Sequence, residues 1–382
     1  FIIVISLFII LSIMRLQSAR KRKSKVVTFA RYFAVIGGAL FIGYLTSLPI
    51  SKFYYDATAL KKNTLTPGSQ EVVEKLEGGL TITTYVNILD ENYGSALPDQ
   101  LKNDFARFEQ YVRFKPEIKM KYVYYYAPSV QPSFPGRFEE LQEKERAEKI
   151  CKIMDLDFDM FLSPEEIDQL VDLRAEGYRF VRVLERENGQ KTILRLYNDM
   201  MKHPSETEIT TALKRFLVPA PRIAFLTGHG ERSVNSSGDR YYYTFAKSIY
   251  FRQSLINQGF DPVSVPLTEE WEIPDDLQIL LIIDPKEPFS TVELEKIRAY
   301  VASGRHLILA TDVNRSEITG ELLADFGVKA LPGMLIQPRK DEDPTNINAV
   351  FTPQAGGINP MFAQWANRNY PLSMTGAVGL SY

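Results

Sequence analysis

The stretch RIAFLTGHGE at residues 222–231 decides how the second half of the chain is interpreted. Its apolar run, Ile223 to Leu226, is typical of a strand buried on both faces, and it ends abruptly in a polar, glycine-flanked segment. In α/β folds, loops that leave the carboxyl ends of parallel strands are where ligands bind. Thr227, Gly228, His229, Gly230 and Glu231 are therefore a candidate ligand-binding loop, and the alternative is a tight turn in which His229 is hydrogen-bonded locally.

Strands and helices alternate on the carboxyl side of this loop. Further apolar strands are predicted at VSVPL (263–267), ILLIID (279–284) and HLILATD (306–312), with helices at about 242–258 and 290–303. Buried strands that alternate with helices predict a mostly parallel sheet with helices on both faces. We therefore expect residues 222–382 to form a flavodoxin-like α/β domain. We expect it to be incomplete at its carboxyl end, because no clear closing element precedes Tyr382.

A second α/β pattern occupies residues 53–216, and the proline-containing segment LVPAPR (217–222) is expected to link the two domains. The predicted strands are 80–89, 117–128 and a hairpin within 178–198 whose turn is Asn188-Gly189. The predicted helices are about 68–77, 98–114, 137–154, a short one after the Ser163 cap, and 204–216.

Two apolar runs at the amino-terminal end predict membrane helices. Phe1 to Met14 is almost wholly apolar but short, so we interpret it as the end of a transmembrane helix, and Tyr32 to Ile50 is long enough to span a bilayer. The basic loop that completes residues 1–31 is expected to be cytoplasmic, which places everything after about Lys52 outside the inner membrane. The alternative interpretation of 20–48 is a signal peptide.

Charge and cysteine content exclude several classes of function. The chain holds 45 basic and 47 acidic residues, and seven of the basic ones lie before residue 32, where there is no acidic residue. The body is therefore acidic, which argues against nucleic acid as a partner. Cys151 is the single cysteine, so the chain has no internal disulfide.

The TGHGE loop is not accompanied by the sequence motifs that catalysis or cofactor binding requires. Gly228-x-Gly230 resembles the start of a dinucleotide fingerprint, but Ser233 stands at the third glycine position. No G-x-S-x-G, P-loop, H-E-x-x-H or C-x-x-C motif occurs in the sequence. We therefore expect no cofactor, no catalytic residue and no enzymatic activity. The alternative is an extracytoplasmic hydrolase that uses His229 and Glu231 as an acid/base pair.

A second, lesser candidate site is the acidic segment DLDFDMFLSPEE. Asp155, Asp157, Asp159 and Glu166 stand at positions 1, 3, 5 and 12 of a calcium loop, but Met160 occupies the position that calls for glycine. A calcium-binding envelope module is therefore an alternative function, although we expect no metal. A glycan-binding module is the related alternative, because tyrosines gather at 122–126 and 241–243 and could stack on sugars.

Three stretches together resemble the gliding-motility-associated, GldG-like auxiliary family of ABC transporters. The first is YYDATALKKNTLTPGSQEVVEKLEGGLTITTYV, which follows a membrane span and carries the family's Asp56, Thr58 and Thr64-Leu65-Thr66 pattern. The second is the strand with TGHGE, and the third is ILLIIDPKEPFSTVELEKIRAYVASGRHLILATD. The resemblance covers about residues 32–330.

The resemblance implies an inner-membrane protein with a periplasmic body that assists an ABC-type export system. Its expected partners are an ABC ATPase subunit, a permease that is separate or fused to this chain, the lipid bilayer and an unknown envelope cargo. The second domain is also similar to the glutamine-amidotransferase-like fold, but without the cysteine nucleophile of that fold. The resemblance transfers no catalytic residue, so the TGHGE loop is expected to have a structural or binding role.

Overall fold

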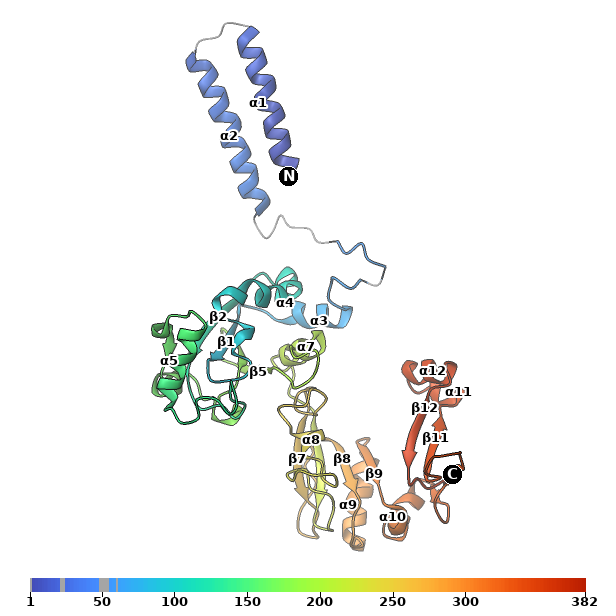
Figure 1. The fold of residues 1–382 in the computed structure, drawn as a ribbon. Coiled ribbons are helices and arrows are strands. Elements are labelled where there is room, and N and C mark those ends of the chain that lie inside the picture. The colour runs from blue at the N-terminus through green and yellow to red at the C-terminus, as the bar shows by residue number, and fades with distance from the viewer. Residues whose placement is uncertain (1, 21–24, 48–54, 60) are drawn as a thin grey trace. The chain divides into compact units, whose positions relative to one another are not determined.

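The computed structural model describes residues 2–20, 25–47, 55–59 and 61–382 (Figure 1). The chain has a mixed α/β fold, as expected. It divides into two compact units, one of Phe1–Leu80 with Pro98–Lys119 and the other of Thr81–Leu97 with Met120–Tyr382.

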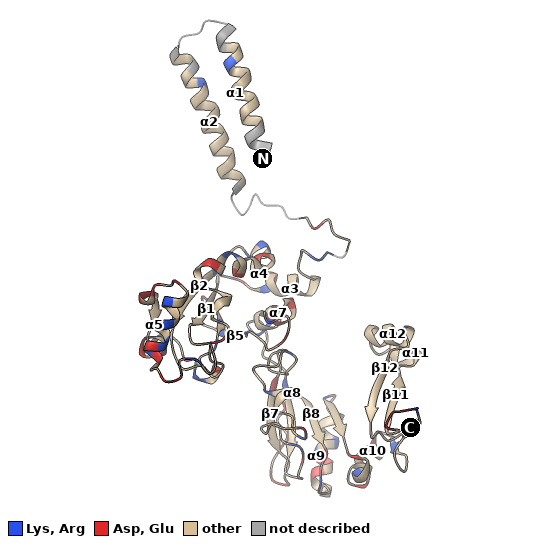
Figure 2. Cartoon of the chain, viewed as in Figure 1, with Lys and Arg blue, Asp and Glu red and all other residues tan. Residues whose placement is uncertain are grey.

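The first unit begins with two apolar helices, α1 (Ile2–Arg20) and α2 (Lys25–Ser47). Among the described residues, one segment is long and apolar enough to cross a membrane, Phe29–Thr46 within α2. The apolar part of α1, Ser6–Gln17, is shorter. Figure 2 shows few charged residues along either helix. The basic residues Lys21, Arg22 and Lys23 of the predicted loop, and the end of the predicted span at 48–50, lie outside the described residues.

Two helices complete this unit. In α3 (Pro67–Lys75), Pro67 opens the helix, and the Thr66 hydroxyl accepts a hydrogen bond from the Ser69 amide, which caps the amino end. The second helix is α4 (Leu101–Phe114), preceded by the 3₁₀ turn η3 (Pro98–Gln100). Lys115 follows α4 and donates from Nζ to the Leu76 carbonyl at 2.6 Å, which joins the ends of the two helices.

The first sheet has five strands in the order β3-β2-β1-β4-β5. The strands are β1 (Leu80–Asn87), β2 (Ile118–Tyr125), β3 (Phe161–Leu162), β4 (Val181–Arg186) and β5 (Lys191–Arg195). Strands β4 and β5 pair antiparallel around Asn188-Gly189, which confirms the predicted hairpin, and Gly189 has the positive φ that this turn requires. The short 3₁₀ turns around the sheet are η2 (Tyr93–Ser95), η4 (Phe158–Met160) and η5 (Arg174–Glu176).

The helices α5 (Glu143–Ile153), α6 (Pro164–Leu170) and α7 (Glu206–Lys214) each begin at a capping box. The predicted helix at 137–154 is therefore too long at its start. Phe138 has a φ of +62°, which no right-handed helix contains, and Gln142 then caps α5.

The second sheet consists of four parallel strands in the order β7-β6-β8-β9. They are β6 (Arg222–Thr227), β7 (Asp261–Pro266), β8 (Leu277–Ile283) and β9 (His306–Ala310), with α9 (Thr291–Ala302) between the last two. Alternate residues of β6 face opposite sides, so Ala224 and Leu226 pack in the core that includes α9, and Ile223 and Phe225 pack in a second core. This confirms the predicted mostly parallel sheet.

The predicted helix at 242–258 is wrong, because only α8 (Tyr243–Ala246) is helical there. The following residues use polar side chains to bond their own backbone. Asn257 Nδ2 donates to the carbonyls of Ser248 and Phe251, and the Ser254 hydroxyl donates to the Ser248 carbonyl. Such local bonds compete with the helical ladder. They fold residues 247–260 into turns.

The guanidinium of Arg252 ties these turns to the region of α7. It donates to Asp199 Oδ2 at 2.5 Å and to Glu208 Oε2 at 2.7 Å, and its side chain is 5% exposed. A straight helix through this segment would direct these side chains along its own surface instead. Tertiary ion pairing therefore overrides the helical pattern of the sequence.

Beyond β9 the parallel sheet gives way to helices and short antiparallel pairs. The elements are η6 (Val313–Arg315), α10 (Ser316–Asp325), β10 (Lys329–Ala330), β11 (Asn346–Val350), α11 (Pro353–Gly356), α12 (Pro360–Asn367), β12 (Pro371–Thr375) and β13 (Leu380–Ser381). Strand β10 pairs with β13, and β11 pairs with β12. The rings of Phe351, Phe362 and Trp365 stack together beside the β11–β12 pair.

Candidate functional site

The TGHGE loop lies at the carboxyl end of β6, and its two glycines are required there. The Thr227 carbonyl accepts a hydrogen bond from the Leu267 amide at 3.0 Å, which draws the loop against the end of β7. Gly228 has a φ of +128° and a side-chain carbon there would meet the Leu267 carbonyl oxygen at 3.1 Å. Gly230 has a φ of +73°, and a side-chain carbon there would meet the side chain of Lys286 at 3.1 Å. The loop is a tight turn held on both sides.

His229 is enclosed rather than presented to solvent, with 7% of the residue exposed. Its ring Nε2 lies 3.1 Å from Glu293 Oε2, and its Nδ1 lies 3.5 Å from Glu231 Oε1. Its ring also packs on Phe289, with centroids 4.5 Å apart. The carbonyl of His229 accepts the amides of Lys286 and Glu287. Both the backbone and the ring of His229 therefore fasten the loop to the segment between β8 and α9.

The two carboxylates around His229 are also used in backbone capping. Glu231 Oε2 accepts the His229 amide at 2.8 Å, and Glu293 Oε2 accepts the Ser290 amide at 2.8 Å in the capping box that begins α9. Glu293 lies 64 residues from His229 along the chain, and sequence reasoning did not connect the two. The arrangement joins the end of β6 to the first turn of α9. In this arrangement the His229 ring and both carboxylates face one another and are largely buried.

A second polar group, which sequence reasoning missed, lies at the same edge of the sheet. Asp284 follows β8 and is held between two arginines, with Arg232 Nε 3.1 Å from Oδ2 and Arg315 Nη1 2.5 Å from Oδ1. Asp312 follows β9. The sequence did contain a signal for this group, because Asp284 and Asp312 each lie at the carboxyl end of a predicted parallel strand. Polar residues in that position meet at one edge of the sheet.

Arg232, Asp284 and Asp312 line part of a cavity of about 400 Å³. Its walls come from the segment after β6, the carboxyl ends of β8 and β9, and two segments further along the chain: Arg232, Tyr242, Ile283, Asp284, Ala310, Thr311, Asp312, Val313, Asn314, Met334, Thr375 and Gly376. Burial alone would raise the pKa of Asp284, but hydrogen bonds from Arg315 and Arg232 outweigh burial and hold that pKa below its ordinary value. Asp284 is therefore ionised and fixes both guanidinium groups.

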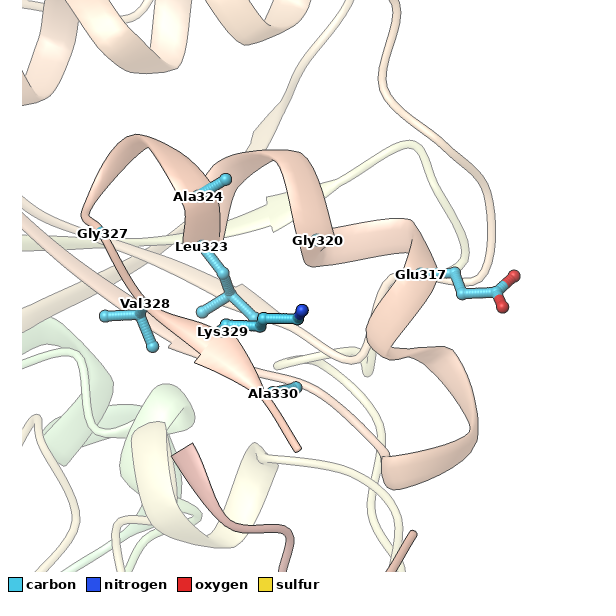
Figure 3. A pocket seen from close by; sticks show the side chains of 8 residues that line it. All are labelled: Glu317, Gly320, Leu323, Ala324, Gly327, Val328, Lys329 and Ala330. Atoms are coloured by element: carbon cyan, nitrogen blue, oxygen red, sulfur yellow. The ribbon is translucent and has the colours of Figure 1, made fainter. Parts of the chain in front are cut away.

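A second cavity, of about 520 Å³, lies between α10 and β10. Figure 3 shows its lining, in which Leu323, Ala324 and Val328 are apolar and Lys329 supplies an ammonium group. The carboxylate of Glu317 points away from the other labelled side chains (Figure 3). Because the polar groups do not converge, we assign no chemistry to this cavity.

Two of the four candidate calcium residues serve as backbone caps in the structure. Asp157 Oδ1 accepts the Asp159 amide at the start of η4, and Glu166 Oε2 accepts the Ser163 amide in the capping box of α6. Asp155 adopts a left-handed conformation with a φ of +53°. In the part of the chain that the structure describes, no group of three or more His, Cys, Asp or Glu residues is placed to hold a metal ion.

The tyrosines at 122–126 and the cysteine pack inside the protein, whereas Tyr241 of the second cluster is 49% exposed. Tyr125 and Tyr126 are buried, and the Tyr124 hydroxyl donates to the Ala96 carbonyl. The ring of Tyr242 lies 6.1 Å from that of Phe225. Burial raises the pKa of the Cys151 thiol to about 11, which disfavours the nucleophilic thiolate form.

Comparison with known proteins relates the second sheet to a transport family. Residues 220–365 match the family model described as an ABC-type uncharacterized transport system, in its auxiliary component. The matched residues include β6 to β9, the TGHGE loop and all of the residues that line the 400 Å³ cavity except Thr375 and Gly376. The match supports an auxiliary component of an ABC-type transport system.

Other comparisons add little. No curated protein matches the chain. The mmIFT52 N-terminal domain is a similar solved structure, with 16% identity, coverage of 42% of this chain and 68% of that chain, and a TM-score of 0.30. A TM-score this low carries no argument about fold or function.

Proposed function

We propose that this protein is a non-enzymatic, membrane-anchored auxiliary component of an ABC-type export system of the gliding-motility, GldG-like type. The observation that carries the proposal is the family match over residues 220–365 in a chain that also has an apolar helix at Phe29–Thr46. The protein binds cargo or couples the permease to partners in the envelope. Its partners are a separate ABC ATPase, a permease that is separate or fused, and the lipid bilayer.

The charge pattern supports an orientation with the body outside the inner membrane. Basic residues at 15–31 precede the apolar segment, and loops rich in Lys and Arg stay cytoplasmic. The residues after α2 then belong to the periplasmic side. The first domain of this body covers 53–216 and the second covers 222–382.

The strand order supports a flavodoxin-like form for the second domain. When the four strands are numbered in chain order, β7-β6-β8-β9 is a 2-1-3-4 order, which matches the first four strands of the 2-1-3-4-5 order of flavodoxin-like sheets. The glutamine-amidotransferase-like fold would place a cysteine nucleophile after a central strand. In this chain the single cysteine, Cys151, lies on α5 beside the other sheet.

The environment of His229 favours the non-enzymatic form of the proposal over a hydrolase. A general base must reach the proton that it removes. The ring of His229 instead lies between Glu231 and Glu293, and its backbone carbonyl bonds the Lys286 and Glu287 amides. The hydrolase would need this closed turn to open.

The test is purification of the full-length protein from its native membrane in a mild detergent, with partners identified by mass spectrometry. We expect a stoichiometric ABC ATPase. A known ABC transporter, purified in parallel from the same membrane, is the control for detergent damage. If the control keeps its ATPase and this protein has none, the proposal is wrong.

A further inference from the structure

The cavity at the carboxyl ends of β8 and β9 has the size and position of a small-molecule site. Its volume of about 400 Å³ falls in the range of ligand pockets, roughly 300–1,000 Å³. Ligands of open parallel sheets bind outside the carboxyl ends of the strands, where this cavity lies. The TGHGE loop itself is closed by its own hydrogen bonds, so the adjacent cavity is the better place for a ligand.

The two Nη atoms of Arg232 are available to bind a carboxylate in this cavity. Its Nε is bonded to Asp284 Oδ2 at 3.1 Å, which fixes the plane of the group. Its two Nη atoms make no hydrogen bond within the described residues, and the side chain is 31% exposed. A guanidinium held in this way presents two parallel N–H donors, which match the two oxygens of a carboxylate.

The charged side chains at this cavity are two cations and two anions. Arg232 and Arg315 balance Asp284 and Asp312, so the four groups together are formally neutral. Asp284 pairs with both arginines, whereas Asp312 pairs with neither in the described residues, so a ligand meets a cation at Arg232 and an anion at Asp312. Because both arginines are already oriented by Asp284, binding requires little further ordering of their side chains.

Asp312 requires that the ligand also carry hydrogen-bond donors. Its Oδ1 accepts the amide and the Nδ2 of Asn314, at 3.0 and 3.2 Å, which orients the carboxylate. Its Oδ2 accepts no hydrogen bond in the described parts of the chain. An acceptor oriented in this way needs a ligand that also donates hydrogen bonds, through hydroxyl or ammonium groups.

We propose that this cavity binds a small carboxylate that also carries hydroxyl or ammonium donors. Arg232 holds the carboxylate, and Asp312 accepts from the donors. Such a ligand is a sugar acid or an amino acid, which share this chemistry. The inference deepens the cargo-binding form of the proposed function and rests on it for the role of the ligand.

The test is calorimetric titration of the full chain in detergent with three probes: D-glucuronate, L-serine and the neutral sugar D-glucose. We expect glucuronate or serine to bind and glucose not to bind, and the one that binds identifies the source of the carboxylate. Arg232→Gln should weaken binding by roughly ten- to a hundredfold, the range expected for hydrogen bonds to a charged group. Asp312→Asn should weaken it by about tenfold while preserving the shape of the side chain.

The matched control is Arg222→Gln. Arg222 begins the strand β6, whose end precedes Arg232. It is 32% exposed and forms a comparable ion pair with Asp276 at 2.5 Å, but it is no part of the cavity wall. Binding should be unchanged in this variant. The proposal is overturned if neither carboxylate binds, or if Arg232→Gln and Asp312→Asn both bind it as tightly as the unmodified chain. If an ABC ATPase copurifies with this protein, the proposed function holds whether or not the cavity binds a carboxylate.

Discussion

Replacement of His229 by alanine tests whether the TGHGE loop is a structural clamp. The variant removes the ring that stands between Glu231 Oε1 and Glu293 Oε2 and that packs on Phe289. Two carboxylates then remain enclosed without the ring between them. The loop keeps its backbone bonds from the carbonyl of residue 229 to Lys286 and Glu287.

The expected loss follows from these contacts. The His229 ring makes a hydrogen bond to the Glu293 carboxylate, and a hydrogen bond to a charged group is worth about 1.5–3 kcal/mol. Glu293 retains the Ser290 amide and Glu231 retains the amide of residue 229, so we expect a loss of about 2 kcal/mol. For a cooperative unit of 150–250 residues, 1 kcal/mol corresponds to about 2–4 °C, so the melting temperature should fall by about 4–8 °C.

Tryptophan fluorescence can follow the relevant sheet alone. The chain has two tryptophans, and Trp271 is partly buried against the core that contains α9. A Trp365→Phe background leaves Trp271 as the reporter. His306→Ala is the matched control, because His306 lies exposed at the start of β9 and its replacement should change stability by less than about 0.5 kcal/mol.

Equal melting temperatures for His229→Ala and His306→Ala would refute the clamp. A His229→Ala protein that stays fully stable but no longer supports export would instead favour a direct chemical or binding role for the ring. Loss of stability together with loss of export is the result that the structure leads us to expect.

Three further predictions concern single positions. Gly228→Ala should cost about 2–3 kcal/mol by thermal unfolding, because φ is +128° and the Leu267 carbonyl is 3.1 Å from the new carbon. Gly304→Ala, with a φ of +85° and open space around it, should cost only about 1 kcal/mol. The pKa of Asp284 is lowered in the folded state, so its stabilising contribution is complete above the unfolded value of about 3.9 and is lost as pH falls through the folded value. The melting difference between Asp284→Asn and the unmodified chain should therefore shrink from pH 6 toward pH 3, and a constant difference would contradict this reasoning. Cys151 should react with a thiol reagent at pH 8 only after denaturation, because burial raises its pKa to about 11, and rapid labelling of the folded protein would show that α5 opens.

The local pattern of the sequence was sufficient for several elements. The hairpin around Asn188-Gly189 forms because Gly189 readily takes the positive φ that closes a three-residue loop, 187–189, between the two strands. The capping box at Ser163 likewise starts α6, and the apolar run after Arg222 forms a central parallel strand. In each case the residues that determine the element are neighbours in the chain, so their spacing alone carries the information.

Residues 242–258 show where local pattern fails. The spacing of apolar residues favours a helix, but Arg252 pairs with Asp199 and Glu208, which lie more than forty positions earlier. The hydrogen bonds of Asn257 to nearby carbonyls complete the alternative conformation. Ion pairs of this kind depend on where distant segments meet, which periodicity does not encode.

In the candidate site, too, the sequence determines one part and the tertiary structure determines the rest. The sequence by itself determined that a glycine-flanked turn follows a buried strand, because an apolar run that ends in TGHGE has few other conformations. Only the tertiary structure decided what surrounds that turn. It places Glu293 against His229, and it sets Arg232, Asp284 and Asp312 around one cavity. Parallel strands bring their carboxyl ends together regardless of their separation in the chain, so these contacts exist only once the sheet has formed.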